Sequence, residues 1–177
     1  MIKSNRRTFI ASRASLFLAG LVLLPASFAS AASATATFQV TATVLKACAV
    51  VGPGTLAFGS YTPSTGTPLA GSTSFTVICT YGTPYSVGLS VGLGSGATLT
   101  ARKMTSPSAS AGNNLLTYGL FKESTFATSW DNSVSGTGYV ANGVIQPFTI
   151  YGQIPAGQYG AAPATDYADT VTLTLTY

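Results

Sequence analysis

The carboxylates and cysteines are the side chains of this chain that could do chemistry. The 177-residue sequence contains four acidic residues, two cysteines and no histidine. Without histidine, it has no Ser-His-Asp or Cys-His catalytic arrangement. Two carboxylates can hydrolyse a glycosidic bond, but no spacing here brings two together, and scattered carboxylates are usually solvated loop residues. We expect such positions for all four, which are Glu123, Asp131, Asp166 and Asp169.

Metal and cofactor sites are not predicted either. The absence of histidine removes the usual zinc ligand sets. The run Gly92-Leu93-Gly94-Ser95-Gly96 does not match a phosphate-binding fingerprint, and no helix is expected after it, so we interpret it as a turn. We therefore predict that the protein is not an enzyme and binds no metal or small-molecule cofactor.

The first 31 residues have the composition of a secretory signal peptide. Four basic residues precede an apolar run at positions 16–24, and small residues follow in A-x-A register. The run is shorter than the roughly 20 apolar residues that span a bilayer, which argues against an uncleaved anchor. We expect cleavage after Ala31, or as late as Ala34. Export follows the general secretory route or, because of Arg6 and Arg7, the twin-arginine route.

Cys48 and Cys79 are an isolated pair in this exported chain. Such a pair most simply forms one disulfide bond. A redox or metal-binding pair is the alternative, but the spacing is not C-x-x-C. We therefore predict a Cys48–Cys79 disulfide.

The mature chain is neutral. Four of the eight basic residues leave with the signal peptide, so four remain against four acidic residues. This balance gives no reason to expect a nucleic-acid partner, and a charge-poor surface favours association. The roughly 140 residues fit one domain with one substantial core.

Short segments with the composition of β-strands recur along the mature chain. Clusters of Gly, Pro, Asn and Ser separate them, and no stretch has a convincing helical period. Even spacing of short strands predicts an all-β, immunoglobulin-like sandwich. The predicted strands are 35–46, 48–51 with 56–58, 72–80, 85–92, 97–104, 114–122, 143–154 and 169–177, with loops at 53–54, 61–71, 106–113 and 155–165.

Both ends of the mature chain alternate between apolar and polar residues. A period of two is typical of a strand with one buried face, and a strand at a free terminus can pair with another chain. From the pattern alone, the first of these strands fits its own sandwich equally well. The apolar positions are Ala34, Ala36, Phe38, Val40, Ala42 and Val44 at one end, and Val171, Leu173, Leu175 and Tyr177 at the other.

Six short motifs follow one another along the mature chain. They are Cys48-Ala49-Val50, Leu56-Ala57-Phe58-Gly59-Ser60-Tyr61, Cys79-Thr80-Tyr81-Gly82, Leu116-Thr117-Tyr118-Gly119-Leu120-Phe121 with Trp130, Tyr151-Gly152-Gln153-Ile154-Pro155, and Tyr167-Ala168-Asp169-Thr170-Val171-Thr172-Leu173. Their order and spacing resemble the spore coat protein U domain family, which includes the subunits of archaic, Csu-type chaperone-usher pili. The resemblance covers essentially the whole mature chain.

The resemblance implies an incomplete immunoglobulin-like fold that receives its missing strand from a neighbouring subunit. Residues 32–46 would be the donor segment, with Ala36, Phe38, Val40, Ala42 and Val44 facing the neighbour. Residues 47–177 would be the domain that accepts a strand, with Val171, Leu173, Leu175 and Tyr177 bordering its groove. The implied partners are further copies or related pilins, a periplasmic chaperone and an outer-membrane usher. The implied product is a cell-surface pilus for adhesion and biofilm formation.

Two other functions fit the same sequence. Trp130, Tyr118, Phe121 and Tyr139 could form a sugar- or surface-binding patch of a secreted adhesin or lectin-like module, although such aromatic residues commonly fill sandwich cores. The family resemblance also allows a coat component of a spore or cyst, because fold does not fix function.

Overall fold

The computed structural model describes residues 30–177, which belong to two compact units: residues 1–41, described from residue 30 onward, and residues 42–177. The predicted signal peptide lies almost entirely outside the described residues. Within residues 30–177, no helix is long and apolar enough to cross a membrane.

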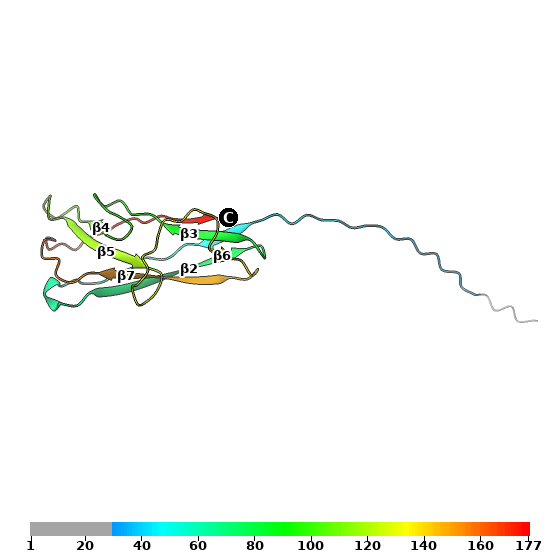
Figure 1. Ribbon diagram of the computed structural model, residues 1–177, viewed down its shortest axis with the longest axis horizontal. Helices are drawn as coiled ribbons and strands as arrows, with labels where there is room; N and C mark the ends of the chain where they lie inside the picture. The colour runs from blue at the N-terminus through cyan, green and yellow to red at the C-terminus, as the bar shows by residue number, and fades with distance from the viewer. Residues whose placement is uncertain (1–29) are drawn as a thin grey trace, which may run out of the picture. The chain divides into compact units, whose positions relative to one another are not determined.

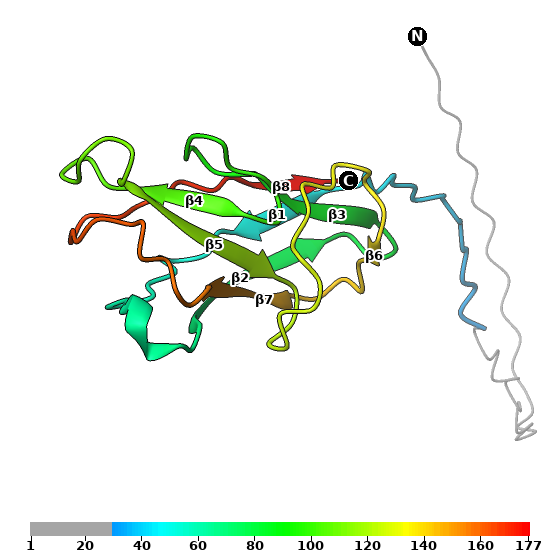
Figure 2. The ribbon, with the colours of Figure 1, turned by 60° about the vertical axis from the view of Figure 1, so that its left-hand side comes forward.

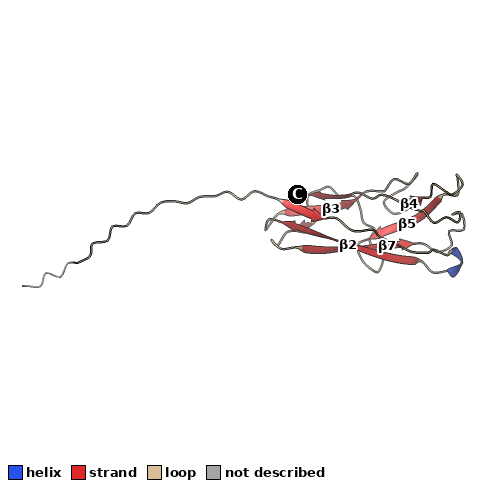
Figure 3. Ribbon diagram, turned by 180° about the vertical axis from the view of Figure 1, so that it is seen from behind, coloured by secondary structure: helices blue, strands red, loops and turns tan. Residues whose placement is uncertain are grey.

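The second unit is built from two antiparallel sheets (Figures 1 and 2). One sheet has the strand order β1-β2-β7-β5-β4, and the other has the order β6-β3-β8. A single turn of 3-10 helix, η1, is the blue element in Figure 3. The bounds are β1 Cys48–Val51, η1 Pro63–Thr65, β2 Leu69–Cys79, β3 Pro84–Leu89, β4 Arg102–Thr105, β5 Leu115–Phe121, β6 Tyr139–Val140, β7 Gln146–Ile154 and β8 Leu173–Thr176.

The two sheets enclose one apolar core. Alternation in β2 turns Phe75, Val77 and Cys79 inward, and each of these side chains is buried. Trp130 packs edge-on against Phe75 at 5.8 Å between ring centroids, and its indole Nε1 donates a hydrogen bond to the Val87 carbonyl. The polar N–H of this buried indole therefore has a hydrogen-bond partner inside the core.

The predicted all-β fold is confirmed, and most predicted strands are present within a few residues of their expected bounds. The expected strand at 97–104 is wrong over its first half, because residues 94–101 form turns with short-range hydrogen bonds such as Thr98 N–H to Ala101 C=O. The terminal strand is shorter than expected, since β8 begins only at Leu173. Residues 56–58 and the described residues 30–47 are assigned to no strand within this single chain.

The predicted disulfide is present. Cys48 and Cys79 lie directly opposite each other in the β1–β2 pair, with their Cα atoms 4.1 Å apart. The bridge fixes the first residue of β1 to the last residue of the eleven-residue β2. The segment that precedes Cys48 is therefore rooted in the larger sheet.

A candidate strand-binding groove

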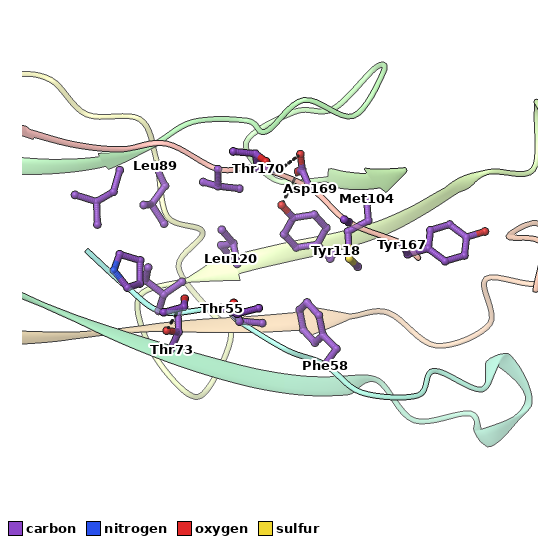
Figure 4. Close-up of a pocket in the computed structure, with 17 residues that line it drawn as sticks. Thr55, Phe58, Thr73, Leu89, Met104, Tyr118, Leu120, Tyr167, Asp169 and Thr170 are labelled. Atoms are coloured by element: carbon purple, nitrogen blue, oxygen red, sulfur yellow. Dashed lines mark hydrogen bonds between the residues drawn. The ribbon is translucent and has the colours of Figure 1, made fainter. Parts of the chain in front are cut away.

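An open groove runs between two stretches of chain that flank the sandwich. One is the segment after β1, and the other leads into β8, which lies at the edge of its sheet. Figure 4 shows Asp169 and Thr170 on one side and Thr55 and Phe58 on the other. The central part of the groove has a volume of about 440 Å³, and its apolar lining includes Leu56, Phe58, Leu89, Met104, Leu120, Ile150, Val171 and Leu173.

A second hollow of about 620 Å³ continues the groove toward the loops at one end of the sandwich. It is bordered by residues 55–61 on one side and by residues 161–167 on the other. The two hollows share five lining residues, so they form one continuous groove. These residues are Thr55, Leu56, Phe58, Met104 and Tyr167.

Residues 53–60 form the first wall, which we name the acceptor edge. Within the described chain, its backbone makes one hydrogen bond, in which Thr73 Oγ1 donates to the Gly54 carbonyl at 3.1 Å. Pro53 has no N–H to donate and interrupts the pairing of β1 with β2. The acceptor edge therefore presents free backbone donors and acceptors.

The second wall is formed by residues 167–173. Ala168 pairs with Thr105, and the Thr172 carbonyl accepts a hydrogen bond from the Ser90 N–H. Between them, in residues 169–171 of the described chain, the Thr170 N–H is the only partnered backbone group, and its partner is the Asp169 carboxylate. This wall therefore also presents unpaired backbone groups, in residues 169–171.

Tyr118 and Asp169 form a polar pair among the residues that line the groove. The Tyr118 hydroxyl donates to the Asp169 carboxylate at 2.7 Å (Figure 4). The Leu93 N–H donates to the same carboxylate. Burial, reinforced by the hydrogen bond to Asp169, raises the pKa of Tyr118, so its hydroxyl remains a donor at neutral pH. The expectation that Asp169 is a solvated loop residue is therefore wrong.

Arg102 lies behind this pair and is fully buried. Its guanidinium donates to four backbone carbonyls, those of Leu89, Ser90, Leu99 and Trp130. Burial lowers the pKa of Arg102, while the nearby Tyr118 and Asp169 raise it. Sequence reasoning missed this role, because nothing local marks Arg102 as different from the other basic residues.

Asp166 is likewise held by protein groups. Its carboxylate accepts hydrogen bonds from the hydroxyls of Ser106 and Ser108. These hydrogen bonds lower the pKa of Asp166. Among residues 30–177, no group of three His, Cys, Asp or Glu side chains could hold a metal ion.

The residues predicted as a donor strand are solvent-exposed. Phe38 is 88% exposed and Val40 is 81% exposed, which is unusual for large apolar side chains. Ala36, Ala42 and Val44 are exposed as well. The segment enters the domain at Ala47, whose carbonyl accepts a hydrogen bond from the Thr80 N–H, next to the disulfide.

Three of the four residues predicted to border the groove pack against the core, and the fourth does not. Val171, Leu173 and Leu175 are half-buried and pack against the core. Val171 and Leu173 also line the groove. Tyr177 does not join this packing, since it is 54% exposed at the end of the chain.

Trp130 and Tyr118, the two main residues of the alternative aromatic patch, do not lie on the surface. Both side chains are buried in the core. The Tyr139 ring stacks on the Tyr85 ring with 5.4 Å between their centroids, whereas the Phe121 ring packs against Phe126. The interpretation of Trp130 and Tyr118 as core residues is therefore correct.

The arrangement is suited to binding an extended peptide. An incoming strand can form backbone hydrogen bonds with both walls while its alternate side chains enter the groove. This is the β-strand addition mode of recognition. The free edges and the groove lie in the same place, so one strand satisfies both.

Comparisons with known proteins place this geometry in context. Residues 34–174 match the family model of the Spore Coat Protein U domain. The chain is 36% identical over 169 residues to Protein U of Myxococcus xanthus, covering 88% of this chain and 91% of that protein.

A solved structure is also similar. It is the crystal structure of the CsuC–CsuE chaperone–tip adhesion subunit pre-assembly complex from archaic chaperone-usher Csu pili of Acinetobacter baumannii. The match has a TM-score of 0.51 and 26% sequence identity and covers 76% of this chain. This chain spans only 40% of the matched chain in that complex.

Proposed function

Because the chain belongs to the Spore Coat Protein U domain family, we propose that it is a structural subunit of a chaperone-usher type pilus that polymerises by donor-strand complementation. Residues 32–46 of one subunit fill the groove of the next. The likeness to a chaperone–subunit complex of Csu pili supports this class of assembly.

One observation carries the proposal: the same chain holds an unfilled strand site and an unpaired, alternating segment. The groove offers free backbone on both walls and an apolar lining. The segment offers Phe38 and Val40 on one face, both exposed. Ten residues of extended chain span about 33 Å, and burying Phe38, Val40 and Val44 contributes roughly 1.5 to 3 kcal/mol each.

The partners and location follow from this mode of assembly. A strand given by one subunit to the next makes a head-to-tail contact that does not close, so it builds an open fibre. We infer that the subunit crosses the periplasm after signal cleavage, is kept folded by a periplasmic chaperone, and passes an outer-membrane usher to the cell surface. Adhesion and biofilm formation are the functions we propose for the fibre, and we infer a structural rather than an enzymatic role.

Removal of the donor segment tests the proposal. The mature chain should form polymers or thin fibres in size-exclusion chromatography and electron microscopy. The same chain without residues 32–46 should stay monomeric and folded. Monomers from both chains would contradict donor-strand complementation.

A coat component of a spore or cyst is the second candidate, favoured by the family description and by the identity to Protein U. The same strand exchange would then build a layer rather than a pilus. Immunogold labelling of cells separates the two, because a pilus subunit labels thin surface fibres and a coat subunit labels the envelope of the dormant cell.

A further inference from the structure

Two glycines face each other beneath the acceptor edge. Gly71 in β2 and Gly152 in β7 are direct register partners in the larger sheet. The side chains of Leu56 and Phe58 lie over them. A Cβ atom at Gly152 would lie 2.7 Å from Phe58 Cζ and 3.0 Å from Leu56 Cδ1, and a Cβ atom at Gly71 would lie 3.2 Å from Leu56 Cδ2. We name this pair the glycine recess.

The recess provides space rather than an unusual backbone conformation. Neither Gly71 nor Gly152 has a positive φ, so an alanine could adopt either backbone conformation. Glycine weakens the interior of a strand and often marks a close approach of another group. Here the approaching groups are the side chains of the acceptor edge.

Leu56 and Phe58 supply most of the attachment of the acceptor edge. Its backbone has a single hydrogen bond, at Gly54. Leu56 and Phe58 are half-buried and pack against the core, and Phe58 meets Tyr118 edge-on at 6.1 Å between ring centroids. The packing of Leu56 and Phe58 in the recess therefore sets how far the backbone of the acceptor edge lies from the larger sheet.

We propose that the glycine recess positions the acceptor edge for the incoming strand, so that Gly71 and Gly152 are positioning residues for strand uptake. This inference rests on the proposed function. A strand inserted between two edges needs them about two strand spacings of 4.7–4.9 Å apart. Hydrogen bonds lose strength quickly outside 2.7–3.2 Å, so a displaced edge binds poorly.

The test measures strand uptake directly. A full mature chain carrying Phe38→Asp, which cannot donate its own strand, is titrated into a fluorescein-labelled peptide of residues 32–46, and binding is followed by fluorescence anisotropy. Adding Gly152→Ala should weaken peptide binding about tenfold or more, because the new methyl group has no free volume to occupy and must displace the side chains of Phe58 and Leu56. Gly160→Ala is the matched control, since no atom lies within 4 Å of its added Cβ, and it should leave the affinity unchanged.

A compensating variant separates positioning from a general loss of stability. Phe58→Leu removes the ring atom closest to the new Cβ and leaves the Leu56 contact at 3.0 Å, so Gly152→Ala with Phe58→Leu should recover part of the affinity that Gly152→Ala alone loses. The near-ultraviolet circular dichroism of buried Trp130 should stay native in each variant. Gly71→Ala, whose contacts are looser, serves if Gly152→Ala does not fold.

The outcomes distinguish this inference from the proposed function. Equal peptide affinity with and without Gly152→Ala would overturn the role of the recess and leave strand exchange intact. No binding by the Phe38→Asp chain itself would overturn strand exchange and the inference with it. Loss of the native Trp130 signal in both alanine variants would also overturn the inference, because the recess would then serve the fold as a whole.

Discussion

Arg102 joins the two sides of the sandwich at the scale of a single residue. Its guanidinium reaches carbonyls at the end of β3, in the loop before β4, and at Trp130. A planar group with five donors can satisfy several carbonyls at once. Arg102 is also the register partner of Tyr118, whose hydroxyl donates to Asp169 in the groove, so this buried cation supports one groove wall.

We expect Arg102→Met to lower the free energy of unfolding by about 3 to 5 kcal/mol, because it leaves buried carbonyls without donors. Urea denaturation followed by Trp130 fluorescence measures the change. Lys122→Met is the control, since it removes only the partly exposed Lys122–Asp131 ion pair and should cost at most about 1 kcal/mol. Equal effects of the two substitutions would show that the Arg102 hydrogen bonds contribute little.

At the scale of elements, the alternating pattern was a good guide wherever a strand finds its partner within the chain. Residues 72–80 were predicted as a strand and form most of β2, whose buried face contains Phe75 and Val77. Residues 56–58 have strand composition yet form no strand, because no backbone within residues 30–177 pairs with them.

The groove contained features that no local pattern could reveal. Asp169 was indistinguishable from the other scattered carboxylates, and its role depends on Tyr118, 51 positions away in the sequence. The glycine recess depends on the β2–β7 register. Hydrophobic periodicity reports which face of a strand is buried, whereas these features depend on which strands become neighbours.

The donor segment should tolerate a charge on one face only. Phe38→Asp should abolish assembly of the mature chain, because a carboxylate would enter the apolar groove without a partner. Thr37→Asp places the same charge one residue earlier, on the opposite face, and should still assemble. Size-exclusion chromatography and electron microscopy of both variants measure the difference. Assembly by the Phe38→Asp chain would remove Phe38 from the interface.

At the scale of the whole molecule, the proposed strand site and its proposed ligand belong to one chain, and neither is paired within residues 30–177. Residues 32–177 contain four basic and four acidic residues, so their net charge is zero and repulsion between copies is weak. The disulfide fixes Cys48, which follows the proposed donor segment, to β2, and β2 pairs with β7 from Leu69–Ile154 to Val77–Gln146. A pull on the segment therefore reaches the centre of the larger sheet rather than the short edge strand alone.

An incomplete sandwich should become more stable when a strand fills it. A ligand that binds only the folded state stabilises it by about 2.7 kcal/mol at one hundred times its dissociation constant. For a domain of this size, that free energy corresponds to a rise in thermal midpoint of roughly 5 to 11 °C. We therefore expect the peptide of residues 32–46, in such excess, to raise the midpoint of the Phe38→Asp chain by this amount in differential scanning calorimetry. The same peptide with Phe38→Asp should leave the midpoint unchanged, and an unchanged midpoint with the native peptide would mean that the groove is not completed by this strand.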